Sequence, residues 1–130
     1  MSQIILVADD DPMIQKLISR MIKRVGFQGE VQVCSDGASA VSYAAETTQA
    51  ISLALLDTSL YAEGDAALAL ALQSHQPTIK IVASSGHSPE ELEGPRHFQG
   101  VHLDGILSKP FGVKDVKELL AGFGLIASDD

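Results

Sequence analysis

Several features that would place the chain in other protein classes are missing from its sequence. Cys34 is the one cysteine, so no disulfide can form within the chain. No apolar run approaches the roughly 18 residues that a membrane-spanning helix needs. The apolar run at residues 4–8 leads directly into acidic residues, unlike a secretory signal. A disulfide scaffold and a membrane span are therefore excluded, and we expect a reducing, cytoplasmic location.

Basic residues are also scarce. Nine lysines and arginines stand against seventeen aspartates and glutamates, which gives a formal net charge of −8. A chain of this charge is repelled by nucleic acid and by anionic membranes, so we expect neither as a direct partner. A cation or a basic protein surface is the better candidate.

The residues that are present have the composition of one globular domain. The 130 residues are 45% apolar and 20% charged, which allows a real core and excludes a wholly disordered chain. No repeat, linker or low-complexity tract divides the sequence. We therefore expect one domain at residues 1–124, followed by a frayed C-terminal tail at residues 125–130.

Short apolar segments alternate with helix-like segments from end to end. The segments expected to form strands are residues 4–8, 31–34, 51–56, 79–83 and 105–107. The first helix should end at Gly26. The fourth should begin at Ser88, with a capping box, and stop early at the Gly-Pro pair of residues 94–95. The alternation predicts an α/β fold, a doubly wound five-stranded parallel sheet with helices on both faces.

Acids, hydroxyls and a lysine concentrate where the expected strands end. They are Asp9, Asp10, Asp11, Asp57, Ser84, Ser85 and Lys109. In an open α/β sheet, ligands bind beyond the carboxyl ends of the strands, so these residues should meet at one edge of the sheet. Asp11 precedes Pro12 and is explained at least as well as the N-cap of the first helix.

Carboxylates that meet in this way require a cation. Three of them within about 4–6 Å would repel one another by several kcal/mol at an effective dielectric constant of ~20. Oxygen ligands without a nearby histidine or thiolate favour Mg²⁺ and disfavour zinc. Lys109 would add a positive charge and Ser85 a hydroxyl donor, and both suit a phosphoryl group on Asp57.

Five short motifs make the sequence resemble a known family, the response-regulator receiver domain of two-component signalling. The motifs are Ile-Leu-Val-Ala-Asp-Asp-Asp-Pro at 5–12, Ser-Asp-Gly at 35–37, Leu-Leu-Asp at 55–57, Ser-Ser-Gly at 84–86 and Ser-Lys-Pro-Phe at 108–111. The resemblance extends from residue 3 to about residue 123. It implies a flavodoxin-like (βα)5 fold with strand order 2-1-3-4-5, and a cis peptide bond between Lys109 and Pro110.

The resemblance implies a signalling function rather than that of an enzyme with a separate substrate. Asp57 would take a phosphoryl group from the phosphohistidine of a sensor histidine kinase or of a phosphotransfer protein. Ser85 and Lys109 would hold the phosphoryl oxygens, and the domain would catalyse only its own phosphorylation and dephosphorylation. A downstream protein would then recognise the face formed by the fourth helix, the fifth strand and the fifth helix.

The resemblance also assigns a Mg²⁺ site and two tuning positions. Asp10 would bind the metal directly and Asp9 largely through water, with Asp57 and the backbone carbonyl of Ser59 as further ligands. Ser59 and His87 would tune dephosphorylation by steering or blocking water. A solvated loop histidine explains His87 equally well.

The sequence departs from the family pattern at several positions. Ile106 stands where relatives commonly have a switch aromatic residue, so a tyrosine-type readout is excluded. Asp65 stands where relatives often have glycine, one residue after Gly64, and the loop after Asp57 lacks the usual proline. The Gly-Pro pair at residues 94–95 interrupts the fourth helix. The remaining histidines, expected at the surface, are His75, His97 and His102.

Two other functions compete with this reading. A Mg²⁺-dependent phosphatase of the haloacid-dehalogenase type would use Asp9 as its nucleophile, because Asp9-Asp10-Asp11 resembles an Asp-x-Asp pair. Such enzymes normally have a cap insertion, which the chain is too short to hold, and a late acidic pair, which here falls in the expected tail. A pseudo-receiver, an interaction module that keeps the fold without the phosphate, would bind no Mg²⁺. Phosphomonoester turnover that depends on Asp9 but not on Asp57 would favour the phosphatase.

Overall fold

Strands and helices alternate without exception along the computed structural model, which describes residues 3–127. The elements are β1 (Ile4–Ala8), α1 (Pro12–Arg24), β2 (Glu30–Cys34), α2 (Gly37–Glu46), β3 (Ile51–Leu56), α3 (Asp65–His75), β4 (Lys80–Ser85), α4 (Pro89–Leu92), β5 (Gly105–Ser108) and α5 (Val113–Gly122). The strands pair in parallel in the order β2-β1-β3-β4-β5. The predicted fold class and strand order are confirmed.

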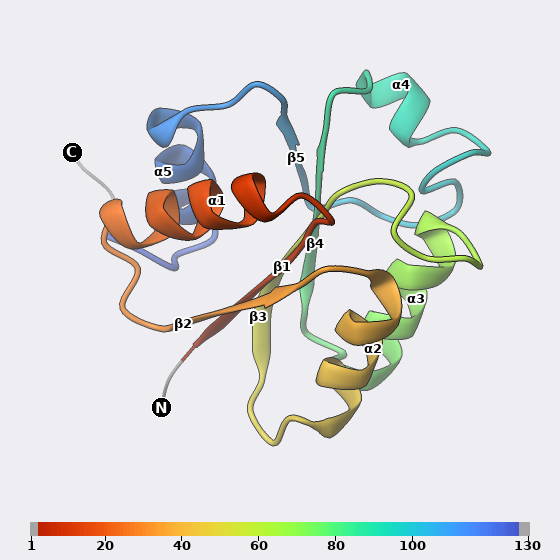
Figure 1. Cartoon of the computed structure of the whole chain (residues 1–130), viewed down its shortest axis with the longest axis horizontal. Coiled ribbons are helices and arrows are strands. Elements are labelled where there is room, and N and C mark those ends of the chain that lie inside the picture. Colours follow the sequence, from red (N-terminus) through yellow and green to blue (C-terminus); the bar gives the residue numbers. More distant parts are fainter. Residues whose placement is uncertain (1–2, 128–130) are drawn as a thin grey trace.

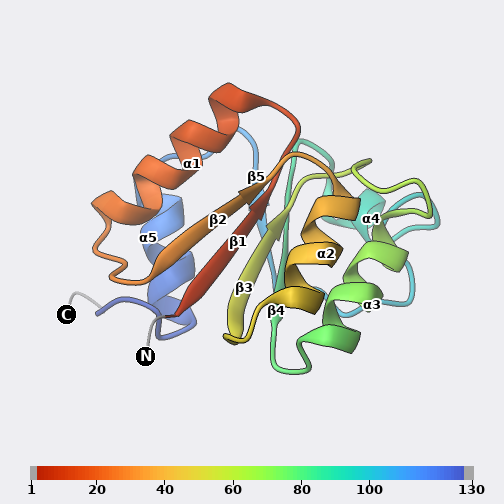
Figure 2. The same cartoon turned by 60° about the horizontal axis from the view of Figure 1, so that its bottom comes forward.

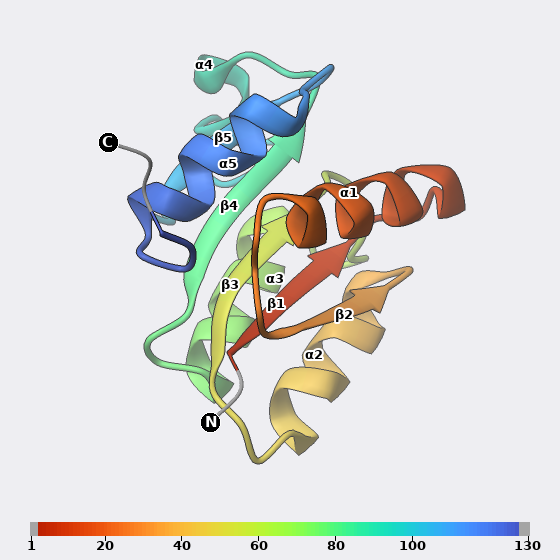
Figure 3. The same ribbon diagram turned by 90° about the vertical axis from the view of Figure 1, so that its left-hand side faces the viewer.

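The sheet is covered on both faces, as Figures 1 and 2 show. Helices α1 and α5 pack on one face, whereas α2 and α3 pack on the other, and the view in Figure 3 looks onto α1 and α5. A parallel strand inside such a sandwich has no solvent face, which is why β1 is apolar throughout and β3 is apolar except for Ser52. All five residues of β1 are buried.

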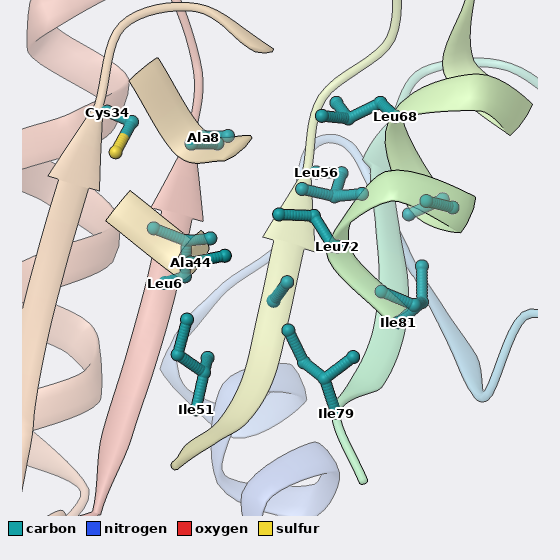
Figure 4. Close-up of a cluster of buried hydrophobic side chains, with 14 of the residues drawn as sticks. Leu6, Ala8, Cys34, Ala44, Ile51, Leu56, Leu68, Leu72, Ile79 and Ile81 are labelled. Atoms are coloured by element: carbon teal, nitrogen blue, oxygen red, sulfur yellow. The ribbon is translucent and has the colours of Figure 1, made fainter. Parts of the chain in front are cut away.

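The side chains of β1 alternate between two separate hydrophobic cores. In β1, Leu6 and Ala8 belong to the core under α2 and α3, whereas Ile5 and Val7 belong to the core under α1 and α5. This is the two-residue period of a pleated strand. Figure 4 shows the first of these cores, in which Leu68 and Leu72 of α3 face the strands.

Helix α1 begins and ends where the sequence predicts. The Asp11 carboxylate caps the helix by accepting a hydrogen bond of 2.9 Å from the backbone N–H of Met13. Gly26, just beyond the last turn, has the positive φ of 103° that ends many helices.

With 13 residues α1 is the longest helix in the described chain. None of the helices there could cross a membrane.

Helix α4 is a single capped turn. The Ser88 side chain accepts from the backbone N–H of Glu91, and the Glu91 carboxylate accepts from the backbone N–H of Ser88. The helix ends at Leu92, so the predicted early stop is confirmed. Residues 93–104 then run in turns, and Phe98, only 1% exposed, inserts into the core from the middle of this segment.

The chain after α5 folds back onto the sheet. The backbone N–H of Leu125 donates to the carbonyl oxygen of Leu120 at 2.9 Å, and the side chains of Leu125 and Ile126 pack against the core under α1 and α5. The frayed tail expected from residue 125 is therefore wrong as far as Ile126, which is held by apolar contact. Residues 128–130 lie outside the described residues.

The single thiol should be slow to react in the folded protein. Cys34 is 6% exposed at the end of β2, and burial, aided by the nearby Asp36 charge, raises the pKa of its thiol. Little thiolate is then present at pH 7.5. We expect alkylation by iodoacetamide to be at least about tenfold slower in the native chain than in the urea-unfolded chain. Equal rates in the two states would show that the thiol is accessible and its pKa ordinary.

Candidate functional site

Three carboxylates meet at the carboxyl ends of β1 and β3. One oxygen from each of Asp9, Asp10 and Asp57 lies within 4.8 Å of the others. The strand pairing explains this convergence, because β1 and β3 are neighbours with Ala8 opposite Leu56. The ladder continues one step further, where the backbone N–H of Asp57 donates to the carbonyl oxygen of Ala8 at 3.0 Å. The first residue after each strand is thereby held at the same edge.

Lys109 connects two of these carboxylates. Its Nζ lies 3.3 Å from Oδ2 of Asp9 and 3.3 Å from Oδ1 of Asp57. Burial alone would lower the pKa of Lys109, but the Asp57 and Asp9 charges outweigh it and the pKa is raised, so the ammonium stays charged. The backbone is fixed by a 2.9 Å hydrogen bond from the N–H of Lys109 to the carbonyl oxygen of Ser85. The predicted cis bond between Lys109 and Pro110 is confirmed.

The surroundings of Asp57 disfavour the ionised form of its carboxylate. Burial raises its pKa, and the Asp9 charge adds to the rise, against the opposing effects of the Thr58 N–H and of Lys109. One lysine therefore does not compensate the negative charge of three acids. The donor set is purely carboxylate, with one member exposed to solvent and open to water ligands, which suits a hard ion such as Mg²⁺. Asp9, Asp10 and Asp57 are the residues that could hold such an ion.

Asp11 does not join the cluster with its side chain. Its carboxylate is used by the α1 cap, as described above. Its backbone N–H instead donates to Oδ1 of Asp9 at 2.9 Å, while Oδ2 of Asp9 faces Lys109. Asp9 is only 1% exposed. Each of its oxygens thus has one donor, and Asp11 acts in the site only by orienting Asp9.

The two serines of β4 face different ways. Both lie inside the strand, which runs two residues further than the sequence predicts, so the expected strand end at residue 83 is wrong. Ser85 is buried, and its Oγ accepts from the backbone N–H of His87 at 3.0 Å. Because this bond uses a lone pair, the hydroxyl hydrogen of Ser85 remains available to an incoming acceptor. Ser84 points by alternation to the other face, and its buried hydroxyl has no hydrogen-bond partner within the described chain.

Asp65 and His97 form a buried polar pair that the sequence did not predict. Asp65, 2% exposed, accepts a hydrogen bond of 2.8 Å from Nδ1 of His97, and the His97 side chain is only 10% exposed. The surface position expected for His97 is therefore wrong. The segment after α4 folds over the start of α3, where the backbone N–H of Ala66 donates to the carbonyl oxygen of His97 at 3.0 Å. The sequence held one indication of this pair, because Asp65 stands where relatives often have glycine.

His75 and His102 lie at the surface, as predicted, whereas His87 and Ile106 are partly buried. His75 is exposed and the His102 side chain is 84% exposed. His87 is intermediate, with 42% of its side chain exposed, Nδ1 3.3 Å from the Glu91 carboxylate and its ring centroid 4.5 Å from that of His97. Ile106 is partly buried against the core under α2 and α3.

Comparison of the sequence with protein families gives one match. The family described as "Response regulator receiver domain" matches residues 5–121. No curated protein sequence matches the chain.

Solved structures with the same fold cover nearly the whole chain. A CheY-like response regulator receiver domain protein from Methanospirillum hungatei has 19% identity and a TM-score of 0.76, over 96% of this chain and 94% of that one. The chemotaxis response regulator CheY4 of Vibrio cholerae has 23% identity and a TM-score of 0.76, over 95% and 99%. The receiver domain of a sensor histidine kinase from Pseudomonas aeruginosa has 21% identity and a TM-score of 0.77, over 95% and 98%. That structure has a magnesium ion coordinated in its active site cleft.

Proposed function

The chain belongs to the response regulator receiver domain family, and we propose that it signals by accepting a phosphoryl group on Asp57. The observation that supports this residue is the position of Lys109, whose Nζ lies 3.3 Å from Asp57 within a cluster of three carboxylates. Asp57 is partly exposed, whereas Asp9 is buried and engaged through both oxygens. Of the two acids that contact Lys109, Asp57 is therefore the one that an incoming phosphorus atom can reach.

The transfer is an in-line displacement. A carboxylate oxygen of Asp57 forms a bond to phosphorus while the bond to the donor breaks, and the electron pair leaves with the donor's nitrogen or oxygen. Lys109 neutralises charge on the phosphoryl oxygens, and Ser85 donates its free hydroxyl hydrogen to one of them. Water later hydrolyses the acyl phosphate and resets the domain.

The metal that this chemistry requires fits the carboxylate cluster. Mg²⁺ would be held by Asp9, Asp10, Asp57 and the backbone carbonyl of Ser59, and when bound it supplies charge neutralisation at the transferred group. The magnesium ion seen in the Pseudomonas aeruginosa receiver domain supports this assignment. Ser59 and His87, each two residues beyond a residue that meets the phosphoryl group, would tune the rate of its hydrolysis.

The partners follow from the same chemistry. A sensor histidine kinase or a phosphotransfer protein supplies the phosphoryl group as phosphohistidine. The new acceptor at Asp57 draws Ser85 inward and biases the adjoining surface, which a downstream protein reads on the face of α4, β5 and α5. A groove between β5 and α5 lies on that face, lined by Ile106, Pro110 and Glu118 among others. Ile106 has no aromatic ring to reorient, so it responds to phosphorylation by a change in its packing.

The geometry does not suit a phosphatase that uses Asp9. In an Asp-x-Asp enzyme the second acid protonates the leaving group, but the Asp11 carboxylate is bonded to the N–H of Met13 at the start of α1. Asp9, the required nucleophile, is 1% exposed and bonded to Lys109. The receiver assignment explains both residues and the phosphatase assignment explains neither.

Removal of the metal gives a direct test. The purified chain is incubated with acetyl phosphate and Mg²⁺, and its intact mass is measured before and after alkaline treatment. We expect one phosphoryl group, lost in alkali, and at least about a hundredfold less of it when a chelator removes Mg²⁺. A chain that binds no Mg²⁺ and gains no mass would instead be a pseudo-receiver. Sustained hydrolysis of a phosphomonoester would indicate the phosphatase.

A further inference from the structure

The backbone at Ser59 adopts a conformation that its residue type disfavours. Its φ is 66°, and it is the only residue other than glycine with a positive φ among those described. A serine in the left-handed region is uncommon, because that conformation is unfavourable unless its surroundings hold it there. Ser59 is also exposed, so packing around its side chain does not provide the restraint.

The restraint comes from Asp65. Its Oδ1 accepts a hydrogen bond of 2.8 Å from the backbone N–H of Ser59, across the loop that joins β3 to α3. Asp65 is the first residue of α3 and is 2% exposed. A buried carboxylate must be paired with hydrogen-bond donors. The loop is therefore closed by a hydrogen bond to a buried acceptor.

Asp65 is in turn held by His97. Nδ1 of His97 donates to Oδ2 at 2.8 Å, so each carboxylate oxygen has one donor and the orientation of the carboxylate is determined. The His97 ring also packs against the His87 ring, and the backbone N–H of His87 donates to Oγ of Ser85. One series of contacts thus joins the loop after Asp57 to the loop after β4.

We propose that Asp65 is a positioning residue for the metal site, which holds the carbonyl of Ser59 in the orientation that Mg²⁺ requires, and that His97 acts through Asp65. The inference rests on the proposed function, in which that carbonyl is a ligand. Partners that orient a ligand typically change metal affinity about ten- to a hundredfold when removed. An aspartate that served only to stabilise the start of α3 would have no such effect.

The test is a Mg²⁺ titration of the full chain followed by two-dimensional amide NMR, with no phosphodonor present. Asp65→Ala should weaken Mg²⁺ binding by about ten- to a hundredfold. Asp65→Asn should retain most of the affinity, because its amide oxygen can still accept from the Ser59 N–H. Glu63→Ala is the matched control, since it removes an exposed carboxylate from the same loop and should bind Mg²⁺ as the wild type does.

The outcomes separate this inference from the proposed function. Wild-type affinity in Asp65→Ala, or equal weakening in Asp65→Ala and Asp65→Asn, would overturn the positioning role while leaving the proposed function standing. Absence of Mg²⁺ binding in the wild type would overturn both. If Asp65→Ala does not fold, hydrogen exchange of the wild type tests the proposal instead. The Ser59 amide should be protected from exchange by its hydrogen bond to Asp65. Exchange at the rate of an unfolded chain would refute that hydrogen bond.

A double mutant tests the part assigned to His97. His97→Ala should weaken Mg²⁺ binding in the same direction as Asp65→Ala, because the unsupported carboxylate loses one of its two donors. If His97 acts only through Asp65, the double variant should bind no more weakly than Asp65→Ala alone. Additive losses would show that His97 affects the metal by another route and would refute its part of the proposal.

Discussion

The Asp57→Asn protein should take up no phosphoryl group from acetyl phosphate in the presence of Mg²⁺, whereas the wild type gains one. An amide is not a nucleophile toward phosphorus at neutral pH, and the neighbouring acids do not replace it. Asp9 is buried and bonded at both oxygens, and in the proposed function Asp10 serves as a metal ligand rather than as a nucleophile. Intact-mass measurement of both proteins after equal incubation checks this prediction.

The same substitution should leave the fold intact. Burial, together with the Asp9 charge, raises the pKa of Asp57, so the ionised side chain is disfavoured in the native state at neutral pH. Asparagine has nearly the same shape and no charge. In metal-free buffer at pH 7 the variant should therefore melt at or above the wild-type temperature, which excludes misfolding as the cause of lost phosphorylation.

Asp36→Asn provides the matched control for this substitution. Asp36 is an exposed acid that caps α2 through a 2.7 Å hydrogen bond from the N–H of Ser39, and asparagine caps equally well. This variant should be phosphorylated like the wild type. A phosphoryl group on the Asp57→Asn protein, mapped by peptide mass to Asp10 or elsewhere, would show that Asp57 is not the acceptor.

Phe98→Ala should lower the free energy of unfolding by about 3–5 kcal/mol. Phe98 is the bulkiest fully buried side chain of the described residues, and its backbone N–H donates to the carbonyl oxygen of Leu92 at 2.7 Å. Residues 93–104 have no helix or strand to hold them. The phenyl ring therefore does two things, filling the core under α2 and α3 and anchoring the segment that carries His97.

Urea denaturation followed by circular dichroism measures this loss. Phe98→Leu should recover most of the stability, because it refills most of the cavity. Met13→Ala is the control, since Met13 is 79% exposed on α1, and its stability should change by no more than about 0.5 kcal/mol. A loss below about 1 kcal/mol in Phe98→Ala would mean that the segment is already loose and that the ring is not an anchor.

The correct predictions of helix caps concern contacts between residues close in the sequence, and the incorrect prediction for His97 concerns a contact between residues far apart in it. The α1 cap at Asp11 and the capping box at Ser88 and Glu91 join residues two or three positions apart, so local chemistry predicts them. His97 was misplaced because its partner, Asp65, is 32 residues away. No periodic pattern runs through residues 93–104 to indicate which of their side chains face inward.

By itself the sequence determined where the strands of the sheet lie and which residues stand at the carboxyl edge of that sheet. Parallel strands covered on both faces are largely apolar, so the strands are visible as apolar runs, and acids placed directly after them must lie at the carboxyl edge. Only the tertiary structure decided which of those groups touch: Lys109 lies 3.3 Å from both Asp9 and Asp57, Asp11 is diverted to a helix cap, and Asp65 holds the backbone of Ser59. The physical reason is that a hydrogen bond or ion pair depends on ångström-scale distances between atoms far apart in the chain, and these distances are set by strand register and loop packing.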